Sequence, residues 1–457
     1  MRYTGCVRVL LVQAFTALDM ELVYPIGLSY LAAHLDEHEV EIFDINLHKD
    51  DPYVQLGARL ERFQPEVVGV SLRNMKVGMP HLHTDDFAPQ QETIAFIKER
   101  FPAIKVVAGG TAFSLYAEAM MDRVPGIDIG VWGEAEHRFP ELLNHLDEPG
   151  TVPGVYYRAD DGAVTYTGPP PTVDFSALRP PRRDLVPHGP YLQSSFVSVG
   201  VQAKRGCALQ CVHCSDVYLV GHNIRMRSAK DVVDEMEHMV REHGVRQMFF
   251  CDQIFNIPVR HSIEICQEIV ERGLDVQWSA WFNEHKKTLP DELMVWLKRA
   301  GCGLLSFSPD HVDDRMLKRL DKNFRYEDML YTVEVARKHG MDVEYSFFLN
   351  APGEDMRSLF AILKFLVHAR LRLGKQLRLF TLLMMQPIRI YPHTRLAEMA
   401  REAGIIPPEH DLIEGQYWNP GTLQYAVKGV QSGAASLYEL RKRWQAARGE
   451  TFQSINR

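Results

Sequence analysis

The sequence has no long apolar run, no surplus of positive charge and no regular set of paired cysteines. None of its apolar runs reaches the roughly 18 residues that a membrane-spanning helix needs, so we expect no membrane span. The formal net charge of −8 argues against a nucleic-acid-binding protein that depends on phosphate contacts. Seven cysteines, three of them in one short stretch, do not fit a disulfide framework. The N-terminal apolar run lacks an A-x-A-like cleavage site, and we therefore expect a soluble, cytoplasmic protein.

Two common cofactor motifs are also missing. No G-x-G-x-x-G follows the first strand-like segment, so nothing supports a nicotinamide or flavin dinucleotide, and the sequence contains no phosphate-binding P-loop. Internal repeats and low-complexity tracts are absent as well. What the chain does have is an ordinary globular composition, 46% hydrophobic and 24% charged, over 457 residues. That length has room for two or three domains.

Strand-like and helix-like segments alternate over residues 1–145. The strand candidates are short apolar runs suited to buried parallel strands, and segments with helical spacing lie between them. Repeated strand–helix–strand order predicts a Rossmann-like α/β domain with helices on both faces of a parallel sheet. A ligand of such a sheet lies at the carboxyl ends of the strands. The strand candidates are Val7–Val12, Val40–Ile45, Val67–Leu72, Ile104–Ala108 and Ile127–Val131.

The rest of the chain divides into three parts. Residues 146–195 are rich in proline and predict a linker in an extended form. Strands and helices alternate again over residues 196–395 and predict a partial (β/α)6 barrel of the TIM type, with function at the C-terminal ends of its strands. Residues 396–457 predict a small helical C-terminal region. The barrel strand candidates are Phe196–Val201, Gln247–Cys251, Val276–Trp281, Leu304–Ser308, Val343–Leu349 and Leu377–Met385.

The stretch 204-KRGCALQCVHCSD-216 carries Cys207, Cys211 and Cys214 at C-x3-C-x2-C spacing. Clustered thiolates bind zinc or iron–sulfur centres. A zinc site needs a fourth ligand, and His213, which lies between Cys211 and Cys214, has no room to close a tetrahedron with both. Buried cysteines without a ligand are a further alternative, but the loop is polar and basic. A four-iron cluster held by three cysteines leaves one iron open, which marks a reactive centre.

The string CALQCVHC, directly after the first strand of the expected barrel, resembles the motif of the radical S-adenosylmethionine (SAM) superfamily. The resemblance implies that Cys207, Cys211 and Cys214 hold a [4Fe-4S] cluster whose open iron binds the amino and carboxylate groups of S-adenosylmethionine. One electron from the cluster then cleaves a C–S bond, which gives methionine and a 5′-deoxyadenosyl radical. The electron implies an external one-electron reductant of the flavodoxin or ferredoxin type.

The resemblance covers most of the barrel. CDQIFNIP (251–258) resembles the second unit, and NAPGED (350–355) resembles the turn after the fifth strand. In the fourth unit this chain has SPD (308–310) where many relatives carry Gly-Ile-Glu. The resemblance implies catalytic roles for Asp252 and Asp310, and SAM contacts for Pro352, Gly353 and Glu354. The structural alternatives are a helix N-cap for Asp252, a surface turn for Asp310, and a plain turn with a charge at a helix N-terminus for the other three.

Polar or glycine-rich segments follow the third, fourth and fifth strands of the N-terminal domain: SLRN (71–74), GGTAFS (109–114) and WGEAE (132–136). Together with the radical SAM motif they resemble the cobalamin-binding domain of the B12-dependent radical SAM subfamily. In another large group of cobalamin proteins, an Asp-x-His-x-x-Gly motif supplies a histidine ligand to cobalt. The nearest string here is 44-DINLH-48, but no glycine lies three residues after His48, so no histidine ligand to cobalt is expected. As alternatives, Arg73 caps a strand end or pairs with Asp44, and the two glycines serve only their turn. The residues that the resemblance assigns to cobalamin are Arg73, Asn74, Gly109, Gly110, Thr111, Gly133 and Glu134.

These resemblances imply a cobalamin-dependent radical SAM methyltransferase. It would transfer a methyl group from methylcobalamin to an unactivated carbon, or to phosphorus, of a small-molecule substrate. One alternative is another radical SAM reaction on the same scaffold, such as cyclisation, oxidation, C–C bond formation or rearrangement, with or without bound cobalamin. Methylthiolation fits less well, because the N-terminal region has no second three-cysteine set. A non-catalytic metal- or corrinoid-binding protein is the alternative from a different class, and an open iron argues against it.

Overall fold

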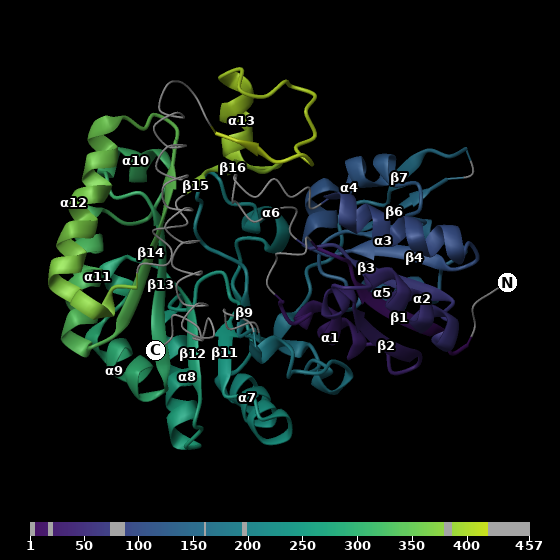
Figure 1. Ribbon diagram of the computed structural model, residues 1–457, viewed down its shortest axis with the longest axis horizontal. Helices are drawn as coiled ribbons and strands as arrows, with labels where there is room; N and C mark the ends of the chain where they lie inside the picture. The colour runs from purple at the N-terminus through teal and green to yellow at the C-terminus, as the bar shows by residue number, and fades with distance from the viewer. Residues whose placement is uncertain are drawn as a thin grey trace.

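The computed structural model describes residues 5–16, 22–73, 87–159, 161–193, 199–378 and 386–418. Two α/β bodies lie side by side, the N-terminal one in purple and blue and the second in teal and green (Figure 1). Helix α13 (Arg395–Glu402) and the short pair β16 (Arg389–Ile390) and β17 (Gln416–Tyr417) lie at one end of the second body. Among the described helices, none combines the length and apolar character needed to cross a bilayer.

The N-terminal body is built on a seven-stranded sheet of order β2-β1-β3-β4-β5-β6-β7, whose first five strands are parallel. Its central strands are apolar runs that are buried on both faces, as a doubly covered parallel sheet requires. This arrangement confirms the predicted Rossmann-like fold. The parallel strands are β1 (Arg8–Gln13), β2 (Glu39–Asp44), β3 (Val67–Ser71), β4 (Lys105–Gly109) and β5 (Ile129–Val131). The helices are α1 (Ile26–Ala32), α2 (Pro52–Phe63), α3 (Phe87–Arg100), α4 (Thr111–Arg123) and α5 (Arg138–Leu143).

The stretch 146–195 is not an extended linker throughout, and the prediction is wrong for its first part. Strands β6 (Val155–Arg158) and β7 (Val164–Tyr166) form an antiparallel hairpin that adds two strands to the N-terminal sheet. Valine and tyrosine favour strands, and Tyr156 stacks on Tyr166 with ring centroids 4.4 Å apart. The proline-rich remainder forms short 3-10 turns, η3 (Phe175–Ala177), η4 (Arg183–Leu185) and η5 (Tyr191–Gln193).

The second body contains a six-stranded parallel sheet of order β15-β14-β13-β12-β11-β8. In the described part of the chain β8 and β15 form its two edges, which agrees with the predicted partial barrel. The strands are β8 (Gly200–Val201), β11 (Gln247–Phe250), β12 (Gln277–Phe282), β13 (Cys302–Asp310), β14 (Asp342–Leu349) and β15 (Gln386–Pro387). The helices are α7 (Ala229–His243), α8 (Val259–Glu271), α9 (Asp291–Arg299), α10 (Asp314–Arg319), α11 (Tyr326–His339) and α12 (Met356–Leu373).

Two predicted strands of the barrel are described only in part. Of the sixth, predicted at 377–385, Leu377 forms a parallel bridge to Val343, and the described strand β15 follows at Gln386–Pro387. Residues 194–198 and 379–385, parts of the first and sixth predicted strands, lie outside the described residues. The predicted helical C-terminal region begins with α13, and residues 419–457 lie outside the described part as well.

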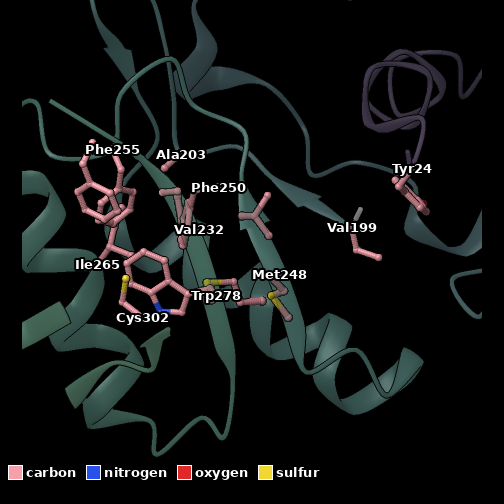
Figure 2. Close-up of a cluster of buried hydrophobic side chains, with 14 of the residues drawn as sticks. Tyr24, Val199, Ala203, Val232, Met248, Phe250, Phe255, Ile265, Trp278 and Cys302 are labelled. Carbon is pink, nitrogen blue, oxygen red and sulfur yellow. The ribbon is translucent and has the colours of Figure 1, made fainter. Parts of the chain in front are cut away.

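Aromatic residues form the centre of the barrel core. Trp278 on β12 lies next to Phe250 and Phe255, each with its ring centroid 4.9 Å from the indole (Figure 2). The Trp278 side chain is buried, and its Nε1–H donates a hydrogen bond of 2.7 Å to the Ala300 carbonyl oxygen. The barrel therefore depends on large rings that fill its interior, with the one polar ring atom satisfied by backbone.

Replacement of this indole tests the core. Trp278→Ala is expected to lower the free energy of unfolding by about 3–5 kcal/mol, because it removes a fully buried ring and leaves the Ala300 carbonyl oxygen without its donor. Urea denaturation followed by circular dichroism measures the change. Trp296→Ala on α9 is the matched control, since Trp296 is only half-buried and its loss is expected to cost about 1 kcal/mol. Equal losses in the two variants would contradict this view of the core.

Candidate active site

The three clustered cysteines lie on a loop between β9 (Lys204–Arg205) and α6 (Asp216–Val220). All three are free and half-buried. The loop is held by its own backbone: the Cys207 N–H donates to the Gly221 carbonyl oxygen at 3.1 Å, and the Cys214 N–H to that of Cys211 at 3.2 Å. Gly206 has a φ of 100°, and a Cβ there would lie 2.1 Å from the Asn223 carbonyl oxygen, so only glycine fits. The sequence therefore folds this loop locally and keeps the thiols together.

The donor set of this loop fits an iron–sulfur cluster. Burial raises the pKa of all three thiols, that of Cys211 to about 11, so buried thiolates here need the positive charge of bound metal. In the part of the chain that the structure describes, no three His, Cys, Asp or Glu side chains converge as ligands of one metal ion. A cluster has no such requirement, because each cysteine binds a different iron.

A buried group of charges lies at the same end of the barrel. Asp310 ends β13 with a φ of 65°, and the Lys322 Nζ lies 2.6 Å from its Oδ2. Burial opposes the positive charge of Lys322, but Asp310, Cys211 and Glu284 outweigh it and raise the pKa of Lys322. Burial raises the pKa of Glu284 to about 8, while the Lys322 charge limits the rise. This set can donate to and accept hydrogen bonds from a polar ligand at the mouth of the barrel.

Lys322 and Glu284 were missed by the sequence reasoning. Glu284 lies two residues past the end of β12, and such positions in a barrel belong to the functional face, which is a signal the sequence did contain. Lys322 lies in a turn after α10 and carries no local signal. Asp310 is not a surface turn, since its side chain is buried beside Lys322, and its catalytic role stays a prediction.

His213 contacts Asp310 and Phe348 and is not placed as a fourth metal ligand beside the three cysteines. Its Nε2 lies 3.4 Å from the Asp310 Oδ2, and its ring packs edge-on against Phe348 at 5.1 Å. Burial lowers the pKa of His213, and the charge of Asp310 acts in the opposite direction. The imidazole therefore links the cysteine loop to Asp310.

Asp252 supports the backbone that leads into the cysteine loop. It is buried, and its Oδ1 accepts hydrogen bonds from the N–H groups of Ala203 at 2.8 Å and Lys204 at 3.1 Å. Burial raises the pKa of Asp252 to about 6, and the Lys204 ammonium limits the rise. The N-cap alternative is wrong, because the next helix, α8, begins at Val259 after Pro258. The contacts in hand make Asp252 a positioning residue.

Polar groups of the turn Pro352–Gly353–Glu354 bind neighbouring groups of the protein. Gly353 has a φ of 78°, which favours glycine, and the Pro352 carbonyl oxygen accepts a hydrogen bond from Arg319 at 3.3 Å. The Glu354 carboxylate accepts the Asn350 N–H and lies 3.3 Å from the His311 Nε2. These contacts favour the structural alternative for Glu354.

A cavity of about 410 Å³ lies between the two bodies. It is lined on one side by the carboxyl ends of β3, β4 and β5, and on the other by barrel residues that include Gln202, Arg205 and Gln253. Its volume is within the range of ligand sites, roughly 300–1,000 Å³. Gly110 has a φ of 92°, and a Cβ there would lie 2.6 Å from the Leu72 carbonyl oxygen, so this turn needs glycine. The cavity brings together five predicted cobalamin residues: Gly109, Gly110, Thr111, Gly133 and Glu134.

Arg73, a further predicted cobalamin residue, is not among the described residues that line this cavity. Arg73 lies close enough to Asp44 to feel its charge. Burial lowers the pKa of Arg73, and the Asp44 carboxylate opposes that change. Asp44 in turn accepts a hydrogen bond of 2.6 Å from the Tyr191 hydroxyl. This environment favours the alternative in which Arg73 pairs with Asp44. Asn74 lies outside the described residues.

Ion pairs join the cavity to the cysteine loop. The Arg205 guanidinium binds Glu134 at 2.9 Å and Glu136 at 2.7 Å, and Arg225 binds the second oxygen of Glu134 at 2.6 Å. Burial opposes the charge of Glu136, but Arg205 outweighs it and holds the pKa of Glu136 below its usual value. The Oε2 of Glu136 accepts no hydrogen bond within the described chain, although the side chain is buried and lines the cavity. A buried anionic oxygen of this kind fits a ligand that presents N–H or O–H donors.

Comparison with known proteins agrees with this geometry. A family model of the B12 binding domain matches residues 20–143, and one of the radical SAM superfamily matches residues 201–366. The chain belongs to the cobalamin-dependent radical SAM enzymes. The first match contains the segments at the ends of β3, β4 and β5, and the second contains the cysteine loop. The cofactors of this family are a [4Fe-4S] cluster, S-adenosylmethionine and cobalamin, in agreement with the residues present.

Relatives of this radical SAM protein include an uncharacterized methyltransferase from Pyrococcus horikoshii, 27% identical over 347 residues, which are 75% of this chain and 72% of the relative. An anaerobic magnesium-protoporphyrin IX monomethyl ester cyclase from Rubrivivax gelatinosus is 24% identical over 73% of this chain and 60% of the relative. The solved structure of the methyltransferase TsrM from Kitasatospora setae, with tryptophan substrate and a SAM analogue bound, matches with a TM-score of 0.75 at 23% identity. That match covers 87% of this chain and 76% of TsrM, and it confirms the predicted fold.

Removal of one thiol tests the cluster assignment. Cys211→Ala is expected to lose the iron–sulfur cluster, because two cysteines cannot hold the three irons that need protein ligands. Iron and sulfide content after anaerobic reconstitution, together with the absorbance near the visible charge-transfer bands, measures the loss. Cys6→Ser is the matched control, since Cys6 is exposed and far along the chain from the loop. Full iron content in Cys211→Ala would contradict the assignment.

Proposed function

We propose that the protein is a cobalamin-dependent radical SAM methyltransferase that acts on an unactivated carbon, or on phosphorus, of a small molecule. The observation that carries the proposal is the position of Arg205. This side chain lines the cavity at the ends of β3, β4 and β5, and it lies two residues before Cys207 in the chain. One residue therefore borders both regions that the two cofactors would occupy.

The residues of the chain have separate roles in this proposal. When bound, the cluster with SAM supplies one-electron cleavage of a C–S bond, and cobalamin supplies a transferable methyl group. Cys207, Cys211 and Cys214 would hold the cluster. Asp310 and Lys322, buried beside them, would orient the polar groups of a ligand at the barrel mouth. Burial of these groups keeps water from the reaction, which suppresses side reactions of a radical.

Cobalamin is supported by the chemistry of the cavity. The corrin ring carries amide side chains at its rim, and their N–H groups are hydrogen-bond donors. The Oε2 of Glu136 is an anionic acceptor without a donor among the described residues, and it belongs to the cavity lining. Glu136 would therefore hold a rim amide, while Gly109 and Gly110 would let the backbone approach the ring.

A carboxylate-to-amide change tests this role. In Glu136→Gln the Arg205 donor draws the side-chain oxygen toward itself, which turns the NH₂ group toward the cavity in place of the acceptor. Affinity for hydroxocobalamin is expected to fall about 10-fold, measured by equilibrium ultrafiltration. Glu134→Gln is the control. It also removes an ion pair with Arg205, but Glu134 has no unpaired oxygen to lose, because Arg205 binds its Oε1 and Arg225 binds its Oε2. Equal loss of affinity in the two variants would contradict the role of the Glu136 Oε2.

The substrate and the reductant are part of the proposal. We infer a small-molecule substrate and an electron donor of the flavodoxin or ferredoxin type. A different radical SAM reaction on the same scaffold is the second candidate, supported by the cyclase among the relatives. Asp310 stays the candidate for contact with SAM or substrate, and Asp252 the candidate for positioning the loop.

One experiment distinguishes the candidates without a known substrate. The protein is reconstituted anaerobically with iron, sulfide and hydroxocobalamin, reduced with titanium citrate, and given SAM labelled in its methyl group. A methyltransferase is expected to move the label to the corrinoid and release S-adenosylhomocysteine. Formation of 5′-deoxyadenosine with no label on the corrinoid would favour the second candidate. Neither product, with a reduced cluster in place, would overturn both.

A further inference from the structure

Helix α12 (Met356–Leu373) carries an exposed apolar stripe on its outer side. The exposed fraction of the residue is 52% at Met356, 61% at Phe360, 55% at Leu363, 60% at Val367 and 80% at Leu371. With 3.6 residues per turn, their spacing puts all five within an arc of about 80°. The opposite face of the helix is the one that packs on the barrel, through Ile362, Phe365, Ala369 and Leu373.

This stripe differs from the rest of the described surface. Eleven large hydrophobic side chains are exposed there, and five of them are on α12, whereas the other six are spread over separate segments. Single exposed apolar residues are ordinary, but a contiguous patch marks a surface that contacts something apolar. The stripe runs from residue 356 to 371, about 22 Å at 1.5 Å per residue. It lies on the face of α12 opposite the residues that pack on the barrel.

The charge of the helix defines the partner. Residues 356–373 contain Arg357, Lys364, Arg370 and Arg372 and no acidic residue, in a chain whose net charge is −8. The neighbouring acid on α11, Glu334, is already bound to Arg337 and Arg372. An apolar stripe beside basic residues requires a partner that is apolar inside and anionic at its rim.

We propose that α12 docks the protein on an anionic lipid surface, with the helix in the plane of the interface. The stripe would enter the acyl region, and the basic residues would meet the headgroups. A second copy of the chain is a poorer occupant, because antiparallel pairing of two such helices brings the basic residues of one against those of the other. In Figure 1 the helix forms the outer side of the barrel, opposite the N-terminal domain, so docking leaves the cavity between the domains uncovered. The proposal does not depend on the methyltransferase assignment.

Vesicle binding of the full chain tests the proposal. Wild-type protein is expected to co-sediment with vesicles of phosphatidylglycerol and phosphatidylcholine, and about 10-fold more weakly with phosphatidylcholine alone. The double variant Phe360→Glu and Leu363→Glu is expected to lose binding to the anionic vesicles by at least about 10-fold. Val54→Glu is the matched control. Val54 is 68% exposed on α2, so this substitution also replaces an exposed apolar residue by glutamate, but away from α12. Circular dichroism checks that each variant is folded.

Three results would overturn the proposal. They are no vesicle binding by the wild type, equal binding by the double variant, and equal loss in Val54→Glu. Light scattering tests the alternative that a second copy of the chain covers the stripe. If the wild type is a dimer that does not bind vesicles, and the double variant is a monomer, the stripe is assigned to a second copy of the chain.

Discussion

The arrangement of the whole molecule depends on buried carboxylates that are neutralised across the boundary between its two bodies. Glu235 on α7 is bound by Arg183, from the segment between the bodies, and by Arg227. Arg227 also donates to the Tyr30 hydroxyl of α1 at 3.0 Å, and Arg183 to the Gly200 carbonyl oxygen of β8. Separation of the two bodies would break these buried ion pairs and hydrogen bonds. The two bodies are therefore held in one relative position by charge as well as by apolar packing.

That fixed position explains how one chain can serve two cofactors. The cysteine loop belongs to the barrel and the glycine turns belong to the N-terminal sheet, so neither body contains a complete site. Lys204 and Arg205 connect them: the Lys204 backbone is held by Asp252, while the Arg205 side chain is held by Glu134 and Glu136. Arg205 also lies over the Phe175 ring at 4.5 Å, which ties the segment between the bodies to the same point. A short β-strand thus sets the relation between the two reactive centres.

The strands that the sequence predicted well are continuous apolar runs, such as the run that forms β1, because burial on both faces leaves a strong local signal. The hairpin of β6 and β7 was missed because its strands are short and lie among prolines and glycines. In the site, the cysteines and the glycine turns were predictable from local motifs. Lys322 and Glu284 were not, since they meet only when separate turns converge at the barrel mouth. The environment of Arg73 depends likewise on Tyr191 and Asp44, far apart in the chain.

The ion pairs of Arg205 have a consequence for how the chain matures on the ribosome. The N-terminal body is synthesised first, and domains fold in that order as they emerge. Its Glu134 and Glu136 then face water as ordinary acidic side chains, because their partners Arg205 and Arg225 have not yet been made. Solvated carboxylates favour solubility at this edge, until the first barrel unit arrives and converts a solvated surface into an interior.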